Sequence, residues 1–89
     1  MTERSVKVAS SVGLHARPAS LFSQAAAQTG FPITLTSASG SSVNAASILG
    51  VLSLGVGPGD TVTLASDADG ADAAIDDLVA LLERDLDKE

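Results

Sequence analysis

The chain has 89 residues, a formal net charge of −6 and no cysteine. A chain of this length builds one modest hydrophobic core, so we expect a single domain over residues 1–89. Without cysteine, disulfides, thiol catalysis and thiolate metal sites are excluded. Hydrophobic residues make up 45% of the sequence, with two Phe and neither Trp nor Tyr, so we expect an aliphatic core.

The charges are unevenly distributed along the chain. Residues 1–59 carry one acidic and three basic residues, whereas residues 60–89 carry ten acidic and two basic residues. A nucleic-acid partner is disfavoured, because binding to phosphates needs a basic patch. The first seven residues contain no apolar run of signal-peptide length, and the apolar stretch 45–56 is too short and too broken by Ser and Gly to span a bilayer. We therefore expect a cytoplasmic protein with no direct membrane insertion.

Four short segments alternate between polar and apolar residues, which predicts strands buried on one face. They are residues 5–8, 32–36, the weaker 41–43, and 61–64. The polar run 37–40 is typical of a hairpin turn between the second and third strands, and residues 57–60 indicate another turn.

Three segments are predicted to be helical. Residues 16–28 carry Pro18 in the first turn, where its missing N–H costs nothing, and Gly30 just past the end. Residues 47–52 form a short helix that Ser47 is placed to cap. Residues 69 to about 86 form the longest helix, with Asp69 as its expected cap. Its apolar stripe consists of Ala71, Ile75, Leu78 and Leu82.

The predicted order is β-α-β-β-α-β-α, with no linker or internal repeat. A sheet with one apolar face needs a cover, and the helices supply it. The sequence therefore predicts an α+β fold, in which a four-stranded, mainly antiparallel sheet is covered by three helices.

The only histidine, His15, is the most informative residue for function. It lies in the run Gly13-Leu14-His15-Ala16-Arg17-Pro18-Ala19. His15 itself directly precedes the first predicted helix, which begins at residue 16. A helix N-terminus presents unpaired N–H groups and a partial positive charge, both of which favour a bound anion. Arg17 adds a permanent planar cation suited to phosphate. Because both features oppose a second positive charge, the neutral and nucleophilic imidazole is favoured. A surface or capping role is the alternative for a lone histidine at this position.

This run resembles the active-site signature of HPr, the histidine-containing phosphocarrier of the phosphoenolpyruvate-dependent sugar phosphotransferase system. Residues 47–55 are similar to the regulatory-serine segment of the Gram-positive branch. Length, element order and both motifs agree, so the resemblance covers nearly the whole chain. It implies an open-faced β-sandwich and a carrier with no independent turnover. Enzyme I would phosphorylate Nδ1 of His15, Arg17 would stabilise the phosphoryl group, and the IIA domains of sugar permeases would receive it.

The resemblance also assigns roles to the short helix. Ile48, Leu49 and Leu52 match the family's apolar docking patch; core packing is the alternative, and a two-turn amphipathic helix must turn some of them inward. Ser47 matches the serine that a bifunctional HPr kinase/phosphorylase modifies, and a transcriptional regulator is a further implied partner. The preceding Ala45-Ala46, where Gram-positive relatives often carry Lys, favours a simple helix cap at Ser47.

Other functions have less support in the residues. One His without Cys supplies too few ligands for a zinc enzyme, and we expect no metal or cofactor. A Ser-His-Asp hydrolase would lack the Gly-x-Ser-x-Gly elbow, and the glycine-rich stretch 55–59 lacks the Lys of a phosphate loop. The remaining alternative is an interaction module whose short helix binds a regulator while His15 is silent. We expect a monomer.

Overall fold

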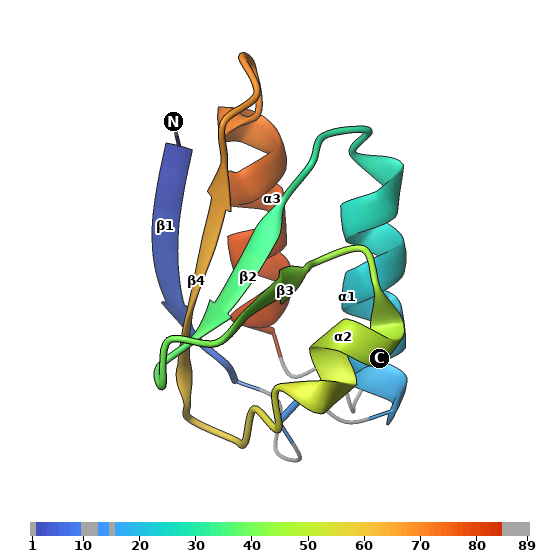
Figure 1. Ribbon diagram of the computed structural model, residues 1–89, viewed down its shortest axis with the longest axis vertical. Helices are drawn as coiled ribbons and strands as arrows, with labels where there is room; N and C mark the ends of the chain where they lie inside the picture. The colour runs from blue at the N-terminus through green and yellow to red at the C-terminus, as the bar shows by residue number, and fades with distance from the viewer. Residues whose placement is uncertain (1, 10–12, 15, 85–89) are drawn as a thin grey trace.

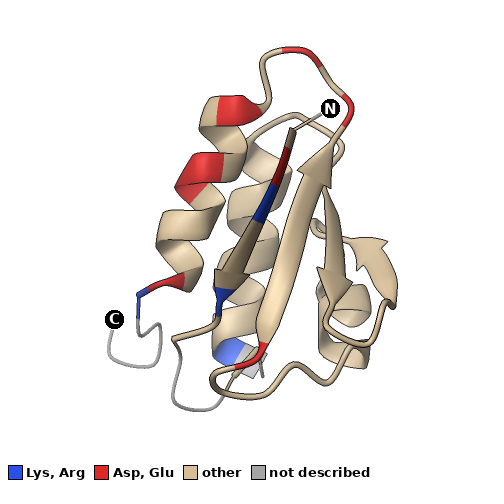
Figure 2. Cartoon of the chain, turned by 90° about the vertical axis from the view of Figure 1, so that its left-hand side faces the viewer, with Lys and Arg blue, Asp and Glu red and all other residues tan. Residues whose placement is uncertain are grey.

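The computed structural model describes residues 2–9, 13–14 and 16–84. The elements follow in the order β1 (Thr2–Lys7), α1 (Ala16–Gln28), β2 (Thr34–Ser37), β3 (Ser42–Asn44), α2 (Ile48–Ser53), β4 (Thr61–Ser66) and α3 (Asp72–Leu82) (Figure 1). The strands form one sheet in the order β1-β4-β2-β3, and each neighbouring pair is antiparallel. Figure 2 shows α1 and α3 lying together on one face of the sheet. The predicted open-faced α+β sandwich is confirmed.

The buried face of the sheet follows from the alternation in its strands. The side chains that face the helices are almost fully buried; they include Val6 of β1, Leu35 of β2 and Leu64 of β4. Phe22 of α1 and Ile75 of α3 cover them and are completely buried. The core is therefore mainly aliphatic, as the composition predicted.

The opposite face of the sheet is polar. The strand register places one row of hydroxyl side chains across all four strands, from Ser5 through Thr63 and Thr36 to Ser42. Ser5 Oγ lies 3.0 Å from Thr63 Oγ1, and Thr36 Oγ1 lies 2.9 Å from Ser42 Oγ. Because these hydroxyls bond to one another and to water, this face needs no covering layer.

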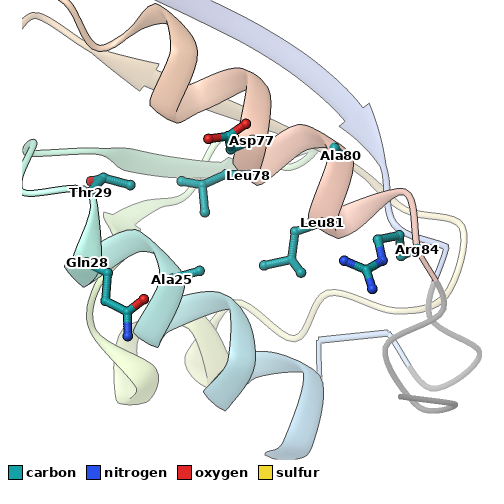
Figure 3. A pocket seen from close by; sticks show the side chains of 8 residues that line it. All are labelled: Ala25, Gln28, Thr29, Asp77, Leu78, Ala80, Leu81 and Arg84. Atoms are coloured by element: carbon teal, nitrogen blue, oxygen red, sulfur yellow. The ribbon is translucent and has the colours of Figure 1, made fainter.

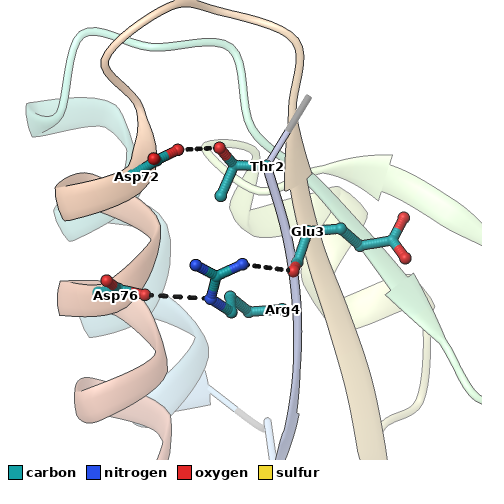
Figure 4. Close-up of polar contacts among 5 residues, drawn as sticks. All are labelled: Thr2, Glu3, Arg4, Asp72 and Asp76. Atoms are coloured by element: carbon teal, nitrogen blue, oxygen red, sulfur yellow. Dashed lines mark hydrogen bonds and ion pairs between the residues drawn. The ribbon is translucent and has the colours of Figure 1, made fainter.

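Two polar contacts join β1 to α3 (Figure 4). Thr2 Oγ1 donates a hydrogen bond to the Asp72 carboxylate, and Arg4 Nε lies 3.4 Å from Asp76 Oδ1. Thr2 and Arg4 lie on the same side of β1 as the buried Val6, facing the helix layer. The prediction placed the start of this strand too late, at residue 5, because Thr2 and Arg4 are polar and interrupt the apolar pattern. Their contacts with Asp72 and Asp76 of α3 allow the strand to begin at Thr2.

The α3 helix is shorter than predicted at both ends. It begins at Asp72, and the prediction that Asp69 caps it is wrong, since the cap position is Ala71 and has no side-chain cap bond. Gly70 has φ +83°, outside the helical region, so the helix cannot extend back to Asp69. The helix ends at Leu82, and residues 85–89 lie outside the described part of the chain. The predicted stripe is confirmed, because all its members are buried: Ala71, Ile75, Leu78 and Leu82.

The other predicted boundaries agree more closely. The α1 helix spans residues 16–28 as predicted, and Gly30 follows it with φ +75°. In the β2–β3 hairpin, Gly40 N donates to the Ser37 carbonyl at 3.0 Å, which confirms the turn at residues 37–40.

Candidate functional site

The start of α1 forms the first part of the candidate site. Because α1 begins at Ala16, His15 directly precedes the helix in the chain, although His15 itself lies outside the described residues. Arg17 is the second residue of α1 and is exposed, whereas Pro18 is buried. The unpaired N–H groups of the first helical turn thus lie immediately after the histidine in sequence.

The segment that leads to His15 is held by the loop after α2. Leu14 N donates to the Val56 carbonyl at 3.0 Å, and both side chains are buried. Gly13 has φ +70°, and a Cβ at this position would lie 2.4 Å from Val56 O. Glycine is therefore needed for both its backbone conformation and the close approach. No local pattern in the sequence indicates this contact between distant residues.

Ser47 caps α2, as predicted. Its backbone is extended, and its Oγ accepts a hydrogen bond of 3.2 Å from Gly50 N. Val51 N donates to the Ser47 carbonyl at 2.9 Å, and Val51 is the buried residue of this helix. Gly50 lets α2 approach β3, because a Cβ there would lie 3.1 Å from Val43 Cβ.

The outward side of α2 carries an apolar cluster, which we call the α2 patch. It consists of Ile48, Leu49 and Leu52, with exposed fractions of 38%, 77% and 37%. These are the exposed large apolar side chains of the described chain. All three are exposed, more than expected, because Val51 alone fills the buried side of α2. The helix contacts α1 and lies level with its N-terminal half in Figure 1.

Charge separates the two sides of the molecule. Figure 2 shows the acidic positions along α3 and in the loop before it, on the far side of the fold from α2. In sequence, α1 carries only Arg17 as a charged residue, and β2, β3 and α2 carry none. Asp60 is the only acidic residue between Glu3 and Asp67. The region around the start of α1 and the α2 patch is therefore poor in carboxylates.

A separate groove lies between α1 and α3 (Figure 3). Leu78 and Leu81 form part of its wall, with Asp77 and Arg84 among the polar lining residues. No residue that the sequence singled out for chemistry lines it, so we assign it no function. In the described part of the chain, no group of three or more His, Cys, Asp or Glu residues could hold a metal ion. None of the described helices has the length and apolar character needed to cross a membrane.

Comparisons with known proteins identify the family. A family model described as "PTS HPr component phosphorylation site" matches residues 2–84. The chain belongs to the HPr family, the phosphocarriers of the phosphotransferase system.

Individual relatives match over nearly their whole length. The phosphocarrier protein HPr of Streptomyces coelicolor is 52% identical over 88 residues, which cover 99% of this chain and 95% of the relative. The HPr-like protein Crh of Halalkalibacterium halodurans is 39% identical over 85 residues, covering 96% of this chain and all of the relative. The crystal structure of HPr-C-His from Thermoanaerobacter tengcongensis superposes with a TM-score of 0.90 at 39% identity, covering 100% of this chain and 99% of that one. The HPr fold is thus shared over the entire chain.

Proposed function

We propose that this protein carries a phosphoryl group on His15 from Enzyme I to the sugar-specific IIA domains. The observation that carries the proposal is the position of the only histidine, directly before the first residue of α1, in a chain that matches an HPr phosphorylation-site family over residues 2–84. In the first step, Nδ1 of His15 attacks the phosphorus of phospho-Enzyme I. The N–P bond to His15 forms as the bond between phosphorus and Enzyme I breaks. In the second step, a nucleophile of the IIA domain attacks the same phosphorus, and the N–P bond to His15 breaks.

The start of α1 supplies electrostatic support for this exchange. A phosphorylated imidazole carries a dianionic group, which the unpaired N–H groups of the first helical turn favour. Arg17 lies in that turn, is exposed, and presents several N–H donors in a fixed plane. We expect Arg17 to hold the phosphoryl oxygens during transfer rather than to take part in the core.

The α2 patch is the proposed docking surface for both partners. A shuttle must release one partner before it meets the next, so its complexes need to be weak and short-lived. A small apolar centre in a region poor in carboxylates suits this requirement, and we expect it to meet acidic partner surfaces. Because Enzyme I and the IIA domains would use the same patch, they bind in turn to a monomeric carrier.

The exposed α2 patch also supports a second candidate, an interaction module for a transcriptional regulator. In this candidate, an HPr kinase/phosphorylase would modify Ser47, which begins the helix that carries the patch. Against it, the Ser47 hydroxyl already caps α2, and neither Ala45 nor Ala46 offers a positive charge to a kinase. We therefore favour the carrier.

A phosphoryl relay experiment separates the two candidates. The protein is incubated with Enzyme I and labelled phosphoenolpyruvate, and a IIA domain is then added. The carrier takes up label that is stable to base and labile to acid, and passes it to the IIA domain. An interaction module takes up no label under these conditions.

A further inference from the structure

The loop between α2 and β4 contains a tight turn at residues 57–60. Asp60 N donates to the Gly57 carbonyl at 3.2 Å, which closes the turn. Pro58 and Gly59, the latter with φ +81°, occupy the two central positions. Proline followed by a glycine of positive φ is the arrangement of a type II turn.

Asp60 braces this turn and joins it to one other part of the chain. Its Oδ2 accepts a hydrogen bond of 2.8 Å from Gly57 N, across the turn. Its backbone carbonyl accepts one of 2.9 Å from Val8 N, and Gly59 N donates to the Val8 carbonyl at 2.9 Å. Asp60 thus fixes the shape of the turn through its carboxylate, and its backbone, together with that of Gly59, attaches the turn to the segment that follows β1.

The same turn supports the segment that precedes His15. Val56, immediately before the turn, accepts the hydrogen bond from Leu14 N at 3.0 Å. Gly13 approaches both Val56 and Gly57, since a Cβ at Gly13 would lie 2.7 Å from Gly57 Cα. In Figure 1 this loop and the start of α1 lie at the same end of the molecule. A shift of Gly57 would therefore move the support on which Gly13 and Leu14 rest.

We infer that Asp60 is a positioning residue for phosphoryl transfer at His15. Its carboxylate holds Gly57 N and thereby the Val56 carbonyl that anchors Leu14, one residue before the histidine. This inference rests on the proposed carrier function. Because in-line transfer depends on the placement of the nucleophile, an error of about 1 Å costs up to about 100-fold in rate. We expect a smaller effect, about tenfold, because the other hydrogen bonds of the loop remain.

Three variants separate the hydrogen bond from the charge. Asp60→Ala removes the acceptor, whereas Asp60→Asn keeps an acceptor oxygen and removes only the charge. Asp67→Ala is the matched control, because it removes an exposed carboxylate just beyond the opposite end of β4. For each variant, the rate of phosphorylation by Enzyme I is measured as a function of the concentration of the variant, together with the amide NMR shifts of Gly13 and Leu14.

The positioning role predicts that Asp60→Ala lowers the maximal rate about tenfold, leaves the KM nearly unchanged and shifts the Gly13 and Leu14 amides. Asp60→Asn should restore most of the rate, and Asp67→Ala should match the unmodified protein. The inference is overturned if Asp60→Ala transfers at the unmodified rate, or if Asp60→Asn is slowed as strongly as Asp60→Ala. An unmodified protein that takes up no phosphoryl group would instead overturn the carrier function, and the positioning role with it.

Discussion

Gly13 is the residue whose replacement the structure constrains most clearly. It has φ +70°, and an added Cβ would lie 2.4 Å from a backbone oxygen of Val56, which cannot move aside as a flexible side chain would. Gly30 is a matched case without this contact, since it has φ +75° and nothing within 4 Å of an added Cβ.

Gly13→Ala should therefore destabilise the protein more than Gly30→Ala. A positive φ costs an alanine about 1–2 kcal/mol at either position, and the overlap adds about 1–3 kcal/mol at Gly13 alone. Urea denaturation of both variants measures the difference. Equal losses of unfolding free energy in the two variants would contradict the close approach of Gly13 to the Val56 carbonyl.

Arg17 should affect phosphoryl transfer and leave stability nearly unchanged. Its side chain is exposed, so Arg17→Lys retains the charge and disturbs no packing, but lysine lacks the planar donor pair that fits a phosphoryl group. We expect slower transfer from Enzyme I and an unchanged melting temperature. Arg4→Lys, on β1 beside Asp76, is the control and should transfer normally. If Arg17→Lys transfers as fast as the unmodified protein, the helix N-terminus provides the electrostatic support alone.

At the scale of elements, α2 offers a direct test of its cap. Two serines bond to Gly50 from opposite ends of the helix: Ser47 Oγ accepts from Gly50 N at 3.2 Å, and Ser53 Oγ donates to the Gly50 carbonyl at 2.7 Å. Only Ser47 satisfies an N–H of the first turn, which has no partner within the helix. Ser47→Ala should lower the unfolding free energy by about 1 kcal/mol and Ser53→Ala by less. A larger loss in Ser53→Ala would contradict the capping role.

The α2 patch should bind partners without contributing to stability. Leu49 is 77% exposed, so Leu49→Glu should leave the melting temperature nearly unchanged. In a complex it would place a charge at an apolar interface, and we expect affinity for both Enzyme I and a IIA domain to fall about tenfold or more, equivalent to about 1.4 kcal/mol. Titration calorimetry measures both affinities. Ala80→Glu, which adds the same charge at an exposed position of α3, should change neither; an equal effect there would indicate a general charge effect.

At the scale of the whole molecule, the proposed site residues Arg17, Ile48, Leu49 and Leu52 are exposed and lie outside the core. The core lies between the sheet and the helices, and the polar ties of Thr2 and Arg4 fasten β1 to α3. Acidic residues lie along α3 and in the loop before it, whereas α2 and α1 carry none. Changes to the proposed site should therefore alter transfer while the fold persists.

Much of this arrangement follows from local pattern. Strict alternation predicted the buried residues Val62 and Leu64 of β4, and the proline at residue 18 fixed the start of α1. Ser47 was predicted as a cap because capping depends only on neighbouring residues. The resemblance, not the pattern, supplied the partners and the chemistry of His15.

What the sequence missed depends on contacts between distant segments. The early start of β1 at Thr2 is stabilised by Asp72 and Asp76 of α3, which no local pattern reveals. The α3 helix begins later than predicted because Gly70 has a positive φ. The contact of Gly13 with Val56 depends on two segments that are far apart in the sequence. The roles of His15, Arg17 and the α2 patch remain predictions.

The attachment site of the phosphoryl group tests the central claim most directly. The protein and its His15→Ala variant are each incubated with Enzyme I and labelled phosphoenolpyruvate. NMR then identifies the nitrogen atom to which the labelled phosphoryl group is attached. We predict label on Nδ1 of His15 in the unmodified protein and none in the variant. The variant should fold normally, because a single residue at a strand–helix junction adds little to the core. Label retained by folded His15→Ala, or found on Ser47 instead, would contradict the account.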